Sequence, residues 1–572
     1  MNRLIALLLT LLLLAGCGSG TAPETTPDET QAGVSAETDA ADRFTDRDYR
    51  TEYEIAECEL ITLGSEDVLI NRAGSYLIQG TLADGQIIVD ADKQEKVQLI
   101  LDGVSITSAA SAPIYIRQAD KVFITLVGEN VLTNGGSFEA IDENNIDAVI
   151  FSKEDLTLNG TGSLAISSPA GHGIVSKDEL TITGGFYDIT CASHGISGKD
   201  NLCIADGAFT IAAGKDGLHA ENNDDATLGF GYIEGGTFTI SAEGDGLSAS
   251  STLEIRGGAF DITTGGGSEN GAKQASGGWG QMGGGRGPGG PGMGGQGMGF
   301  GSMTETETED SASIKGIKAA SDLTITGGSF TLNCADDAVH SNTNVTIKGG
   351  DFTIATGDDA FHADDTLTVE GGAISVSESY EGLEGLHILI AGGDISLISS
   401  DDGLNAAGGT DASGMGGRDQ FGGPGGMGNS DGTIVISGGN IYMEASGDGI
   451  DANGTLEITG GFTVVTGPTQ GDTATLDYDI SATISGGTFI GTGSSMMAQT
   501  FSDNTQGIIA VSLGGSASAG TELLLTDAAG EEVVRFTPNL SYAVVILSTP
   551  DMVSGETYTI TVGTATAEFE AY

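Results

Sequence analysis

Acidic residues recur in this sequence at one place in a repeated pattern, beside a glycine or alanine and shortly before a short run of alternating apolar and polar residues. We call this place the acid slot, and three repeats hold two acids in a row there. Its acidic members are Asp216, Asp245, Asp336 with Asp337, Asp358 with Asp359, Glu381, Asp401 with Asp402, and Asp448. Carboxylate oxygens are ligands of Ca²⁺, which takes about six to eight of them. The chemistry that this pattern favours is calcium binding.

The carboxylates lie one above another if successive repeats stack as coils about 4.8 Å apart. Two unit charges at that distance repel by roughly 3 to 4 kcal/mol at an effective dielectric constant near 20, and an ion between two coils offsets this repulsion. We therefore predict Ca²⁺ as the cofactor, with a second group of ligands where Asp224 follows Asp216. The predicted ligands are Asp216, Asp224, Asp245, Asp336, Asp337, Asp358, Asp359, Glu381, Asp401 and Asp402. The alternatives are turns in which an aspartate hydrogen-bonds its own backbone, or a solvated acidic edge.

A second position lies three residues after the acids, and we call it the downstream slot. It holds His219, His340 and His362 in three repeats. Other repeats hold Ser, Asn, Glu or Asp there, and this variation favours an outward polar ladder over catalytic histidines. His172 and His194 each precede a glycine and are interpreted as turn residues. No zinc site is predicted, because supporting ligands are not evident.

One repeat departs from the pattern, with Lys315 in the acid slot and Lys318 in the downstream slot. The favoured interpretation is charge compensation for Asp336 and Asp337. The alternative is a lyase base that removes a proton from a uronate.

A repeated unit must position these residues. A Gly-Gly-x-aromatic-x-aliphatic pattern recurs with a period of about 22 residues along most of the chain. Residues 323–325 and 330–332 alternate apolar and polar side chains on either side of Gly327 and Gly328, which indicates short strands joined at glycine corners. Such a unit cannot bury its own apolar side chains, so coils stack and share one core. We predict an all-β fold, a right-handed parallel β-helix over residues 51–500.

The predicted β-helix has roughly sixteen coils at this strand spacing. Two insertions rich in Gly and Met, residues 265–303 and 408–430, interrupt it. They are predicted to be flexible loops, and Trp279 in the first is the only tryptophan of the chain. The Gly-Gly pattern stops near residue 500, and residues 501–572 are predicted to form a small C-terminal β cap over the open end.

The first residues have the features of an export signal. Arg3 precedes an apolar run, and Leu-Ala-Gly precedes Cys17, which is typical of a lipoprotein signal peptide. We predict that residues 1–16 are removed, that Cys17 carries diacylglycerol, and that the protein is extracellular, anchored by this lipid to the bacterial cell membrane. Residues 17–50 are rich in small and polar side chains and are predicted to form a disordered tether.

The net charge is −59, from 80 acidic and 21 basic residues. This charge repels nucleic acid and attracts cations. Cys58, Cys191, Cys203 and Cys334 have neither the spacing of a disulfide framework nor that of a metal knuckle. We expect a monomer whose contact with the membrane is through its lipid alone.

The chain resembles the bacterial carbohydrate-binding domain-containing β-helix lipoproteins found mainly in clostridia and their relatives. Asp-Asp-Ala-Val-His-Ser-Asn at residues 336–342 and Ser-Tyr-Glu-Gly-Leu-Glu-Gly at residues 379–385 carry the resemblance, with further blocks from residue 73 to residue 546. It implies a β-helix with bound calcium, similar in shape to pectate lyases, that binds plant cell-wall polysaccharide such as pectin-type polymers or cellulose. The acid corners of the family correspond to Asp336, Asp337, Asp358, Asp359, Asp401 and Asp402.

The leading functional hypothesis is non-catalytic, calcium-dependent binding of an acidic or plant cell-wall polysaccharide at the cell surface. Expected contacts to the sugar are Trp279, Lys315, Lys318, His340 and His362. The alternatives are a pectate-lyase-like polysaccharide lyase and an adhesive or spacer rod.

Overall fold

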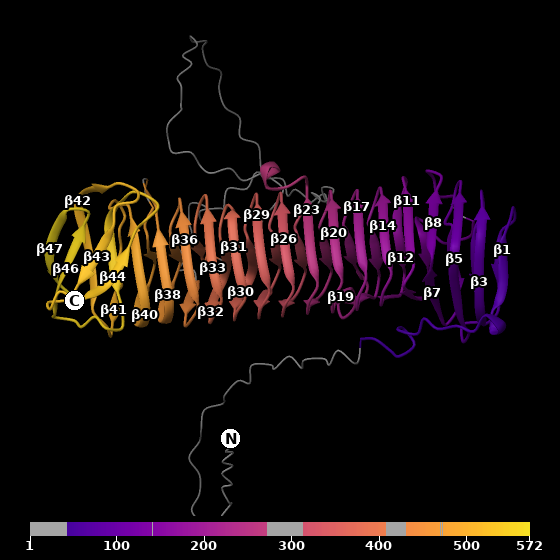
Figure 1. Ribbon diagram of the computed structural model, residues 1–572, viewed down its shortest axis with the longest axis horizontal. Coiled ribbons are helices and arrows are strands. Elements are labelled where there is room, and N and C mark those ends of the chain that lie inside the picture. The colour runs from indigo at the N-terminus through magenta and orange to yellow at the C-terminus, as the bar shows by residue number, and fades with distance from the viewer. Residues whose placement is uncertain (1–42, 140, 272–312, 408–430, 470, 472) are drawn as a thin grey trace, which may run out of the picture. The chain divides into compact units, whose positions relative to one another are not determined.

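The chain divides after Arg43, and Phe44–Tyr572 forms one compact unit. The computed structural model describes residues 43–139, 141–271, 313–407, 431–469, 471 and 473–572. Within these ranges, 43 strands join in one continuous sheet whose pairings are almost all parallel, so that this unit is a parallel β-helix, as predicted (Figure 1). No helix in the described ranges is long and apolar enough to cross a membrane.

Each coil follows from the alternation seen in the sequence. In β25 (Leu323–Ile325) and β26 (Ser329–Cys334) the apolar side chains point into the core, whereas Thr331 between Phe330 and Leu332 is exposed. Phe330 pairs with Phe352 of the next coil, 22 residues on, so the predicted period is confirmed. Gly328 has a φ of +118°, which L side chains rarely adopt, and it makes the corner between the two strands.

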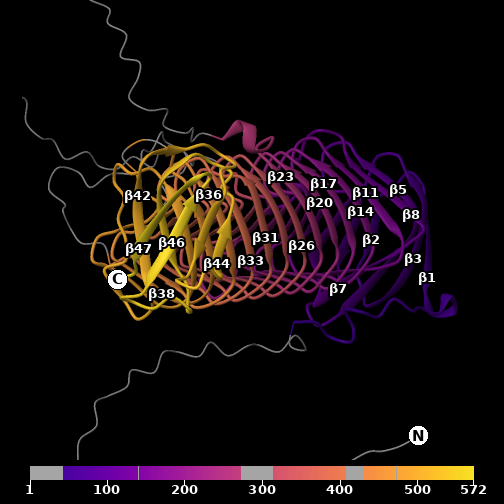
Figure 2. The ribbon, with the colours of Figure 1, turned by 60° about the vertical axis from the view of Figure 1, so that its left-hand side comes forward.

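The strands form three faces, and successive members of a face are hydrogen-bonded to each other (Figure 2). The first face contains β1 (Glu59–Leu63), β3 (Gly74–Leu82), β5 (Lys96–Ser108), β7 (Lys121–Val127), β10 (Asp155–Gly160), β13 (Glu179–Ile182), β16 (Asn201–Ile204), β19 (Phe230–Ile233), β22 (Leu253–Ile255), β25, β28 (Asn344–Ile347), β30 (Phe361–Val369), β32 (Leu383–Ile390), β35 (Thr433–Ile436), β38 (Thr455–Thr466), β40 (Ser481–Gly493) and β41 (Asp503–Asn504).

The second face contains β8 (Glu129–Asn134), β11 (Ser163–Ser168), β14 (Phe186–Cys191), β17 (Ala208–Ala213), β20 (Thr237–Ala242), β23 (Ala259–Thr264), β26, β29 (Asp351–Thr356), β31 (Ala373–Glu378), β33 (Asp394–Ser399) and β36 (Asn440–Ala445). The third face contains β2 (Val68–Ile70), β4 (Ile87–Asp90), β6 (Ile114–Gln118), β9 (Ala148–Ser152), β12 (His172–Ser176), β15 (Ile196–Gly198), β18 (Leu218–Ala220), β21 (Leu247–Ala249), β24 (Ile317–Ala319), β27 (Val339–Ser341), β34 (Leu404–Asn405), β37 (Ile450–Ala452) and β39 (Asp477–Tyr478). The long strands β3, β5, β30, β32, β38 and β40 contribute to two faces each.

The core is a continuous column of buried Ile, Leu, Val and Phe side chains. Six aromatic rings stack within it from coil to coil, with ring centroids 4.6 to 4.9 Å apart. They belong to Tyr187, Phe209, Phe238, Phe260, Phe330 and Phe352. The spacing of neighbouring strands is close to the distance between stacked rings. One register therefore allows both the backbone hydrogen bonds and the ring contacts.

The C-terminal residues leave the coil pattern. β45 (Tyr542–Ser548) runs antiparallel to β40 and to β42 (Ile508–Ala517). β43 (Leu523–Thr526), β44 (Glu532–Phe536), β46 (Thr557–Val562) and β47 (Ala565–Glu570) form a separate antiparallel sheet. A second cluster of buried residues joins these strands to Val464 and Ile490 of the last coils.

The last residues of the predicted tether need one correction. Residues 44–50, expected to be disordered, pack on the first face, where Asp48 is buried. Asp48 accepts a hydrogen bond of 2.7 Å from Thr157 and pairs with Lys121 at 3.0 Å. Sequence composition did not reveal this contact because its partner Thr157 lies more than a hundred residues away. Cys17 and Trp279 lie outside the described residues.

Candidate functional site

The acid slot lies immediately before the strands of the third face, and the downstream slot lies within them. The predicted alignment of the downstream slot is confirmed, because its members are paired from coil to coil. The pairing runs through His219, Ser248, Lys318, His340, His362, Glu384, Asn405 and Asp451. Carboxylates, ammonium groups and imidazoles therefore meet along one corner of the β-helix.

The acid-slot carboxylates bind the backbone of the next coil rather than their own turn. The Oδ1 of Asp337 accepts a hydrogen bond from the backbone N–H of Asp359 at 3.1 Å, and that of Asp359 accepts one from Glu381 at 3.2 Å. The same bond links Asp216 to Asp245, Asp245 to Lys315, Asp402 to Asp448, and Asp448 to Ala474. These acids therefore connect neighbouring coils, which a turn-former bonding its own backbone does not do.

The second oxygen, Oδ2, faces a basic side chain in four of these coils. Asp216 contacts His219 at 2.6 Å, Asp337 contacts Lys315 at 2.6 Å, and Asp359 contacts His362 at 3.5 Å. Asp245 lies 4.0 Å from the ammonium of Lys318. Oδ1 thus links one coil to the next, while the negative charge at Oδ2 is balanced by a positive or protonatable group.

Lys315 performs the expected charge compensation. Its ammonium lies 3.2 Å from Asp336 and 2.6 Å from Asp337, and only 4% of its side chain is exposed. Burial opposes ionisation of Asp337, but Lys315 and His340 together hold its pKa well below the ordinary value. Asp336, Asp337 and Asp358 have oxygens within 4.8 Å of one another. They form an all-carboxylate group, but Lys315 already supplies positive charge there.

His362 is the centre of a second buried network. Its Nδ1 lies 2.6 Å from Glu384, and its Nε2 lies 3.1 Å from Asp364. Burial opposes protonation of His362, but Asp359, Asp364 and Glu384 raise its pKa well above the ordinary value. Burial, followed by the charge of Asp359, raises the pKa of Glu384 to about 8. The surroundings therefore favour the protonated form of both His362 and Glu384.

Asp402, Asp448 and Asp451 form a group of a different kind, with carboxylate oxygens within 4.8 Å of one another. All three are partly exposed, and in the described part of the chain no basic side chain pairs with them. Burial and the neighbouring carboxylates raise the pKa of Asp402 well above its usual range. Burial raises the pKa of Asp448 to about 7 and that of Asp451 to about 6, and neighbouring acids add to both shifts. The group is short of positive charge.

Asn405 offers a further oxygen ligand beside this group. Asn405 is 7% exposed, and its Nδ2 donates to Glu381 of the preceding coil at 2.8 Å. Its Oδ1 is buried and has no hydrogen-bond partner, and in the next coil Asn405 pairs with Asp451. Three carboxylates and an amide oxygen match the all-oxygen ligands that Ca²⁺ selects. The residues present fit a calcium ion here better than at Lys315.

The remaining predicted ligands are less well placed. Asp224 forms an exposed ion pair of 2.7 Å with Lys199, while Asp216 contacts His194 and His219 instead. The predicted second group around Asp216 and Asp224 is therefore replaced by a histidine-containing one. Glu381 is buried, and burial with the charge of Glu384 raises its pKa well above the usual range.

Burial bears on two expectations about the basic residues. The downstream slot is not an outward ladder throughout, because His340 and His362 are 4% and 1% exposed. Lys315 is buried as well. A buried side chain offers little surface to an external polymer, so burial does not favour the expected sugar contacts at these three residues. Lys318 is partly exposed.

Some residues of the site escaped sequence reasoning. Asp448 and Asp451 were not among the predicted ligands, although Asp448 lies in the acid slot and Asp451 in the downstream slot of the same repeat. Glu384 and His194 were also missed as partners. The repeat showed where these residues lie within a coil. Contact partners come from other coils, as with Asp402 and Asp448, which are 46 residues apart, so the sequence did not reveal them.

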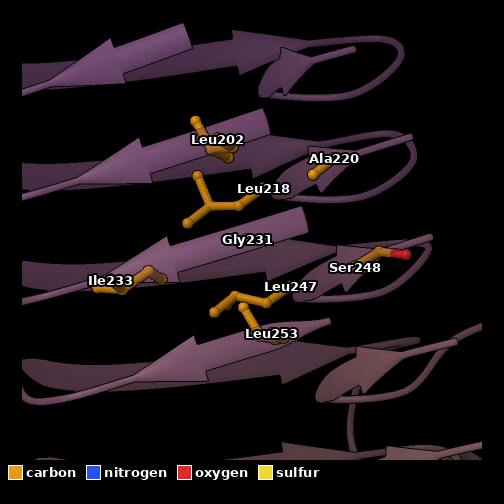
Figure 3. A pocket seen from close by; sticks show the side chains of 8 residues that line it. All are labelled: Leu202, Leu218, Ala220, Gly231, Ile233, Leu247, Ser248 and Leu253. Carbon is orange, nitrogen blue, oxygen red and sulfur yellow. The ribbon is translucent and has the colours of Figure 1, made fainter. Parts of the chain in front are cut away.

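Two hollows lie elsewhere in the described part of the chain. In the column of core residues, Gly231 pairs with Leu202 and Leu253, and its missing side chain leaves a gap of about 10 Å³ (Figure 3). That gap is lined mostly by apolar side chains and is too small for a ligand. An open depression on the second face is lined by Val131, Thr133, Ala165, Ile166, Ser167, Asp188 and Thr190.

Comparisons with known proteins identify related sequences in carbohydrate-binding domain-containing proteins. A relative from Acetivibrio thermocellus, described as a carbohydrate-binding domain-containing protein, is 37% identical over 186 residues, 32% of this chain and 62% of the relative. The chain thus spans less than two thirds of that relative's length. A solved structure described as a polysaccharide lyase-like protein from C. thermocellum, in a gadolinium derivative, is 36% identical, with 35% of this chain and 83% of that chain covered and a TM-score of 0.34.

The model of one protein family matches residues 64–360 and 358–518, which is most of the chain. The description of that family is "carbohydrate-binding domain-containing protein". The chain belongs to this family of carbohydrate-binding domain-containing proteins.

Proposed function

We propose that this protein binds an acidic polysaccharide through calcium held at Asp402, Asp448 and Asp451, and that it does not cleave the polymer. The observation that carries the proposal is the contrast along one corner of the β-helix. Asp216, Asp245, Asp337 and Asp359 each face a basic group, whereas Asp402, Asp448 and Asp451 have none among the described residues.

Partial exposure of this group supports a role in binding. A bound Ca²⁺ supplies positive charge and takes about six to eight oxygens, more than three aspartates and Asn405 provide with one oxygen each. The partly exposed side of the group leaves room for oxygens from outside. A uronate carboxylate of an acidic glycan is such a donor, and membership of a carbohydrate-binding family supports a glycan as the partner.

A polysaccharide lyase is the second candidate, and the basic residues argue against it. A lyase needs a base that reaches the proton beside a uronate carboxylate. Lys315 is buried, and its ammonium is bound by Asp336 and Asp337. Lys318 contacts Ser313 at 3.0 Å and lies on a different coil from the proposed calcium ligands.

The test is retention on immobilised polygalacturonate with calcium and with chelator. We expect calcium-dependent retention that falls at least tenfold in the variant Asp448→Asn with Asp451→Asn. The matched control is Asp188→Asn with Asp261→Asn, which removes two exposed carboxylates from the second face and leaves retention unchanged. Retention that persists in chelator contradicts the calcium bridge, and unsaturated product absorbing in the ultraviolet establishes the lyase instead.

A further inference from the structure

A group of ligands at the corner before β15 and β18 differs in chemistry from the carboxylate groups. The Nδ1 of His194 lies 3.2 Å from the Oδ2 of Asp216, and the Nδ1 of His219 lies 2.6 Å from the same oxygen. The two imidazole rings stack with centroids 4.0 Å apart. Two nitrogens and one oxygen therefore converge within 4.8 Å of one another.

These separations are close to those of a tetrahedral metal site. Zinc bonds to imidazole nitrogen and carboxylate oxygen are about 2.0 to 2.2 Å, so two ligands at a tetrahedral angle lie roughly 3.3 Å apart. The distance from His194 to Asp216 is already close to this value, and a bound ion would replace the hydrogen bond of 3.3 Å that the Nδ1 of His194 accepts from the backbone N–H of Asp216. His219 would move away from Asp216 by a fraction of an ångström, and the stacked rings would turn so that both nitrogen lone pairs face the ion. Between 12% and 14% of each side chain is exposed, so an ion has access from solvent.

The surroundings of the ligands give independent support. The Nε2 of His219, the nitrogen that faces away from Asp216, lies 3.2 Å from a carboxylate oxygen of Glu221. Metal-binding histidines commonly have such a carboxylate at their other nitrogen, because it fixes the ring and its tautomer. The Oδ1 of Asp216 is held at 2.9 Å by the backbone N–H of Asp245, which directs Oδ2 towards the imidazoles.

The other group with two histidines is less suited to a cation. Asp337, His340 and His362 also bring their ligand atoms within 4.8 Å, but all three residues are buried. The ammonium of Lys315 contacts Asp337 at 2.6 Å and repels a second positive charge. No lysine or arginine forms an ion pair with Asp216 in the described part of the chain.

We propose that His194, Asp216 and His219 bind a divalent transition-metal ion such as Zn²⁺, with the remaining positions open to water. This goes beyond the proposed function, because imidazole selects zinc and its neighbours in the periodic table, whereas Ca²⁺ prefers oxygen. The ion links two successive coils, since His194 precedes β15 and Asp216 precedes β18, which pair in register.

The test is calorimetric titration of the chelator-treated, dialysed full chain with zinc chloride. We expect one zinc ion per chain, bound with excess calcium present. The variant His194→Gln with His219→Gln should lose at least tenfold in zinc affinity. The matched control His387→Gln, whose ring contacts Thr433 on the first face, should bind like the wild type.

Three results overturn the proposal: no zinc binding, full affinity in the double variant, or loss of binding only in His340→Gln with His362→Gln. X-ray absorption spectroscopy of the zinc-loaded wild type identifies the ligand atoms directly, so this test does not depend on whether a variant folds. Two imidazole ligands are expected, and a shell of oxygens alone refutes the assignment. Retention on polygalacturonate is independent of this result, so the two proposals fail separately.

Discussion

At the scale of single residues, the acid slot combines two roles in one carboxylate. In Asp216, Asp337 and Asp359, Oδ1 accepts a backbone N–H of the next coil, while Oδ2 meets a basic group. The balancing group comes from the same coil at Asp216 and Asp359, and from the preceding coil at Asp337, where it is Lys315. Where the sequence supplies no basic side chain in the described residues, as at Asp402 and Asp448, the carboxylates carry raised pKa values.

The raised pKa values predict how stability depends on pH. Asp448 has a pKa of about 7 in the folded protein, above the ordinary value of 3.8. Its contribution to stability is therefore fully present below pH 3.8 and is lost as the pH rises through about 7. In chelator, we expect the melting temperature measured by calorimetry to fall from pH 5 to pH 8 in this window, roughly as this linkage requires.

Calcium should oppose that fall, because a ligand that binds only the folded state adds stability. The variant Asp448→Asn keeps the oxygen that accepts from Ala474 but cannot ionise. It should flatten the pH dependence in chelator and reduce the gain from calcium. A wild-type melting temperature that rises from pH 5 to pH 8 in chelator would show that these carboxylates do not control stability there.

At the scale of the element, each short strand is stabilised by the identical position of the next coil. β26 illustrates this, since its Phe330 ring lies between Phe260 and Phe352 with centroids 4.9 and 4.6 Å away. The ring is 1% exposed. A strand of this length has little stability of its own, so most of its stability comes from contacts with neighbouring coils.

Replacing Phe330 by alanine should therefore lower the free energy of unfolding by about 3 to 5 kcal/mol, through lost burial and the cavity left in the stack. Phe186 begins β14 and is 57% exposed, so Phe186→Ala is the control and should change stability by less than about 1 kcal/mol. Denaturant unfolding followed by circular dichroism measures both. Equal effects of the two substitutions would contradict the assignment of stability to the ring stack.

At the scale of the whole molecule, we propose that the β-helix is displayed outside the cell on a lipid carried by Cys17. A net charge of −59 keeps the protein away from other polyanions unless cations intervene. Calcium at the acidic corner would therefore serve both cohesion between coils and capture of an acidic polymer.

The variant Cys17→Ser should move the protein from the membrane fraction to the soluble fraction when the two are separated by centrifugation. Its melting temperature should equal that of the wild type, because Cys17 precedes Phe44, whose ring packs on the β-helix. The control Cys58→Ser changes a cysteine within the described residues and should leave the protein in the membrane fraction. Cys17→Ser protein that stays with the membrane would argue against the lipid anchor.

The sequence by itself determined the coil and its register. Identical residue types every 22 positions, as in Phe330 and Phe352, favour the one alignment that stacks the repeated apolar side chains in the core, so the residue pattern alone locates the acid and downstream slots. Local alternation and glycine corners suffice for this, because each coil repeats the same short-range interactions.

Only the tertiary structure decided which carboxylates are balanced and which are not. Asp402 meets Asp448 across an insertion, and Asp216 meets His194 from the preceding coil, so these contacts depend on how neighbouring coils are placed. Burial was decided at the same level, since His340 and Ser248 occupy the same slot but differ in exposure. A repeat fixes position along the chain, whereas charge and solvent access depend on what adjoining coils bring to the same corner.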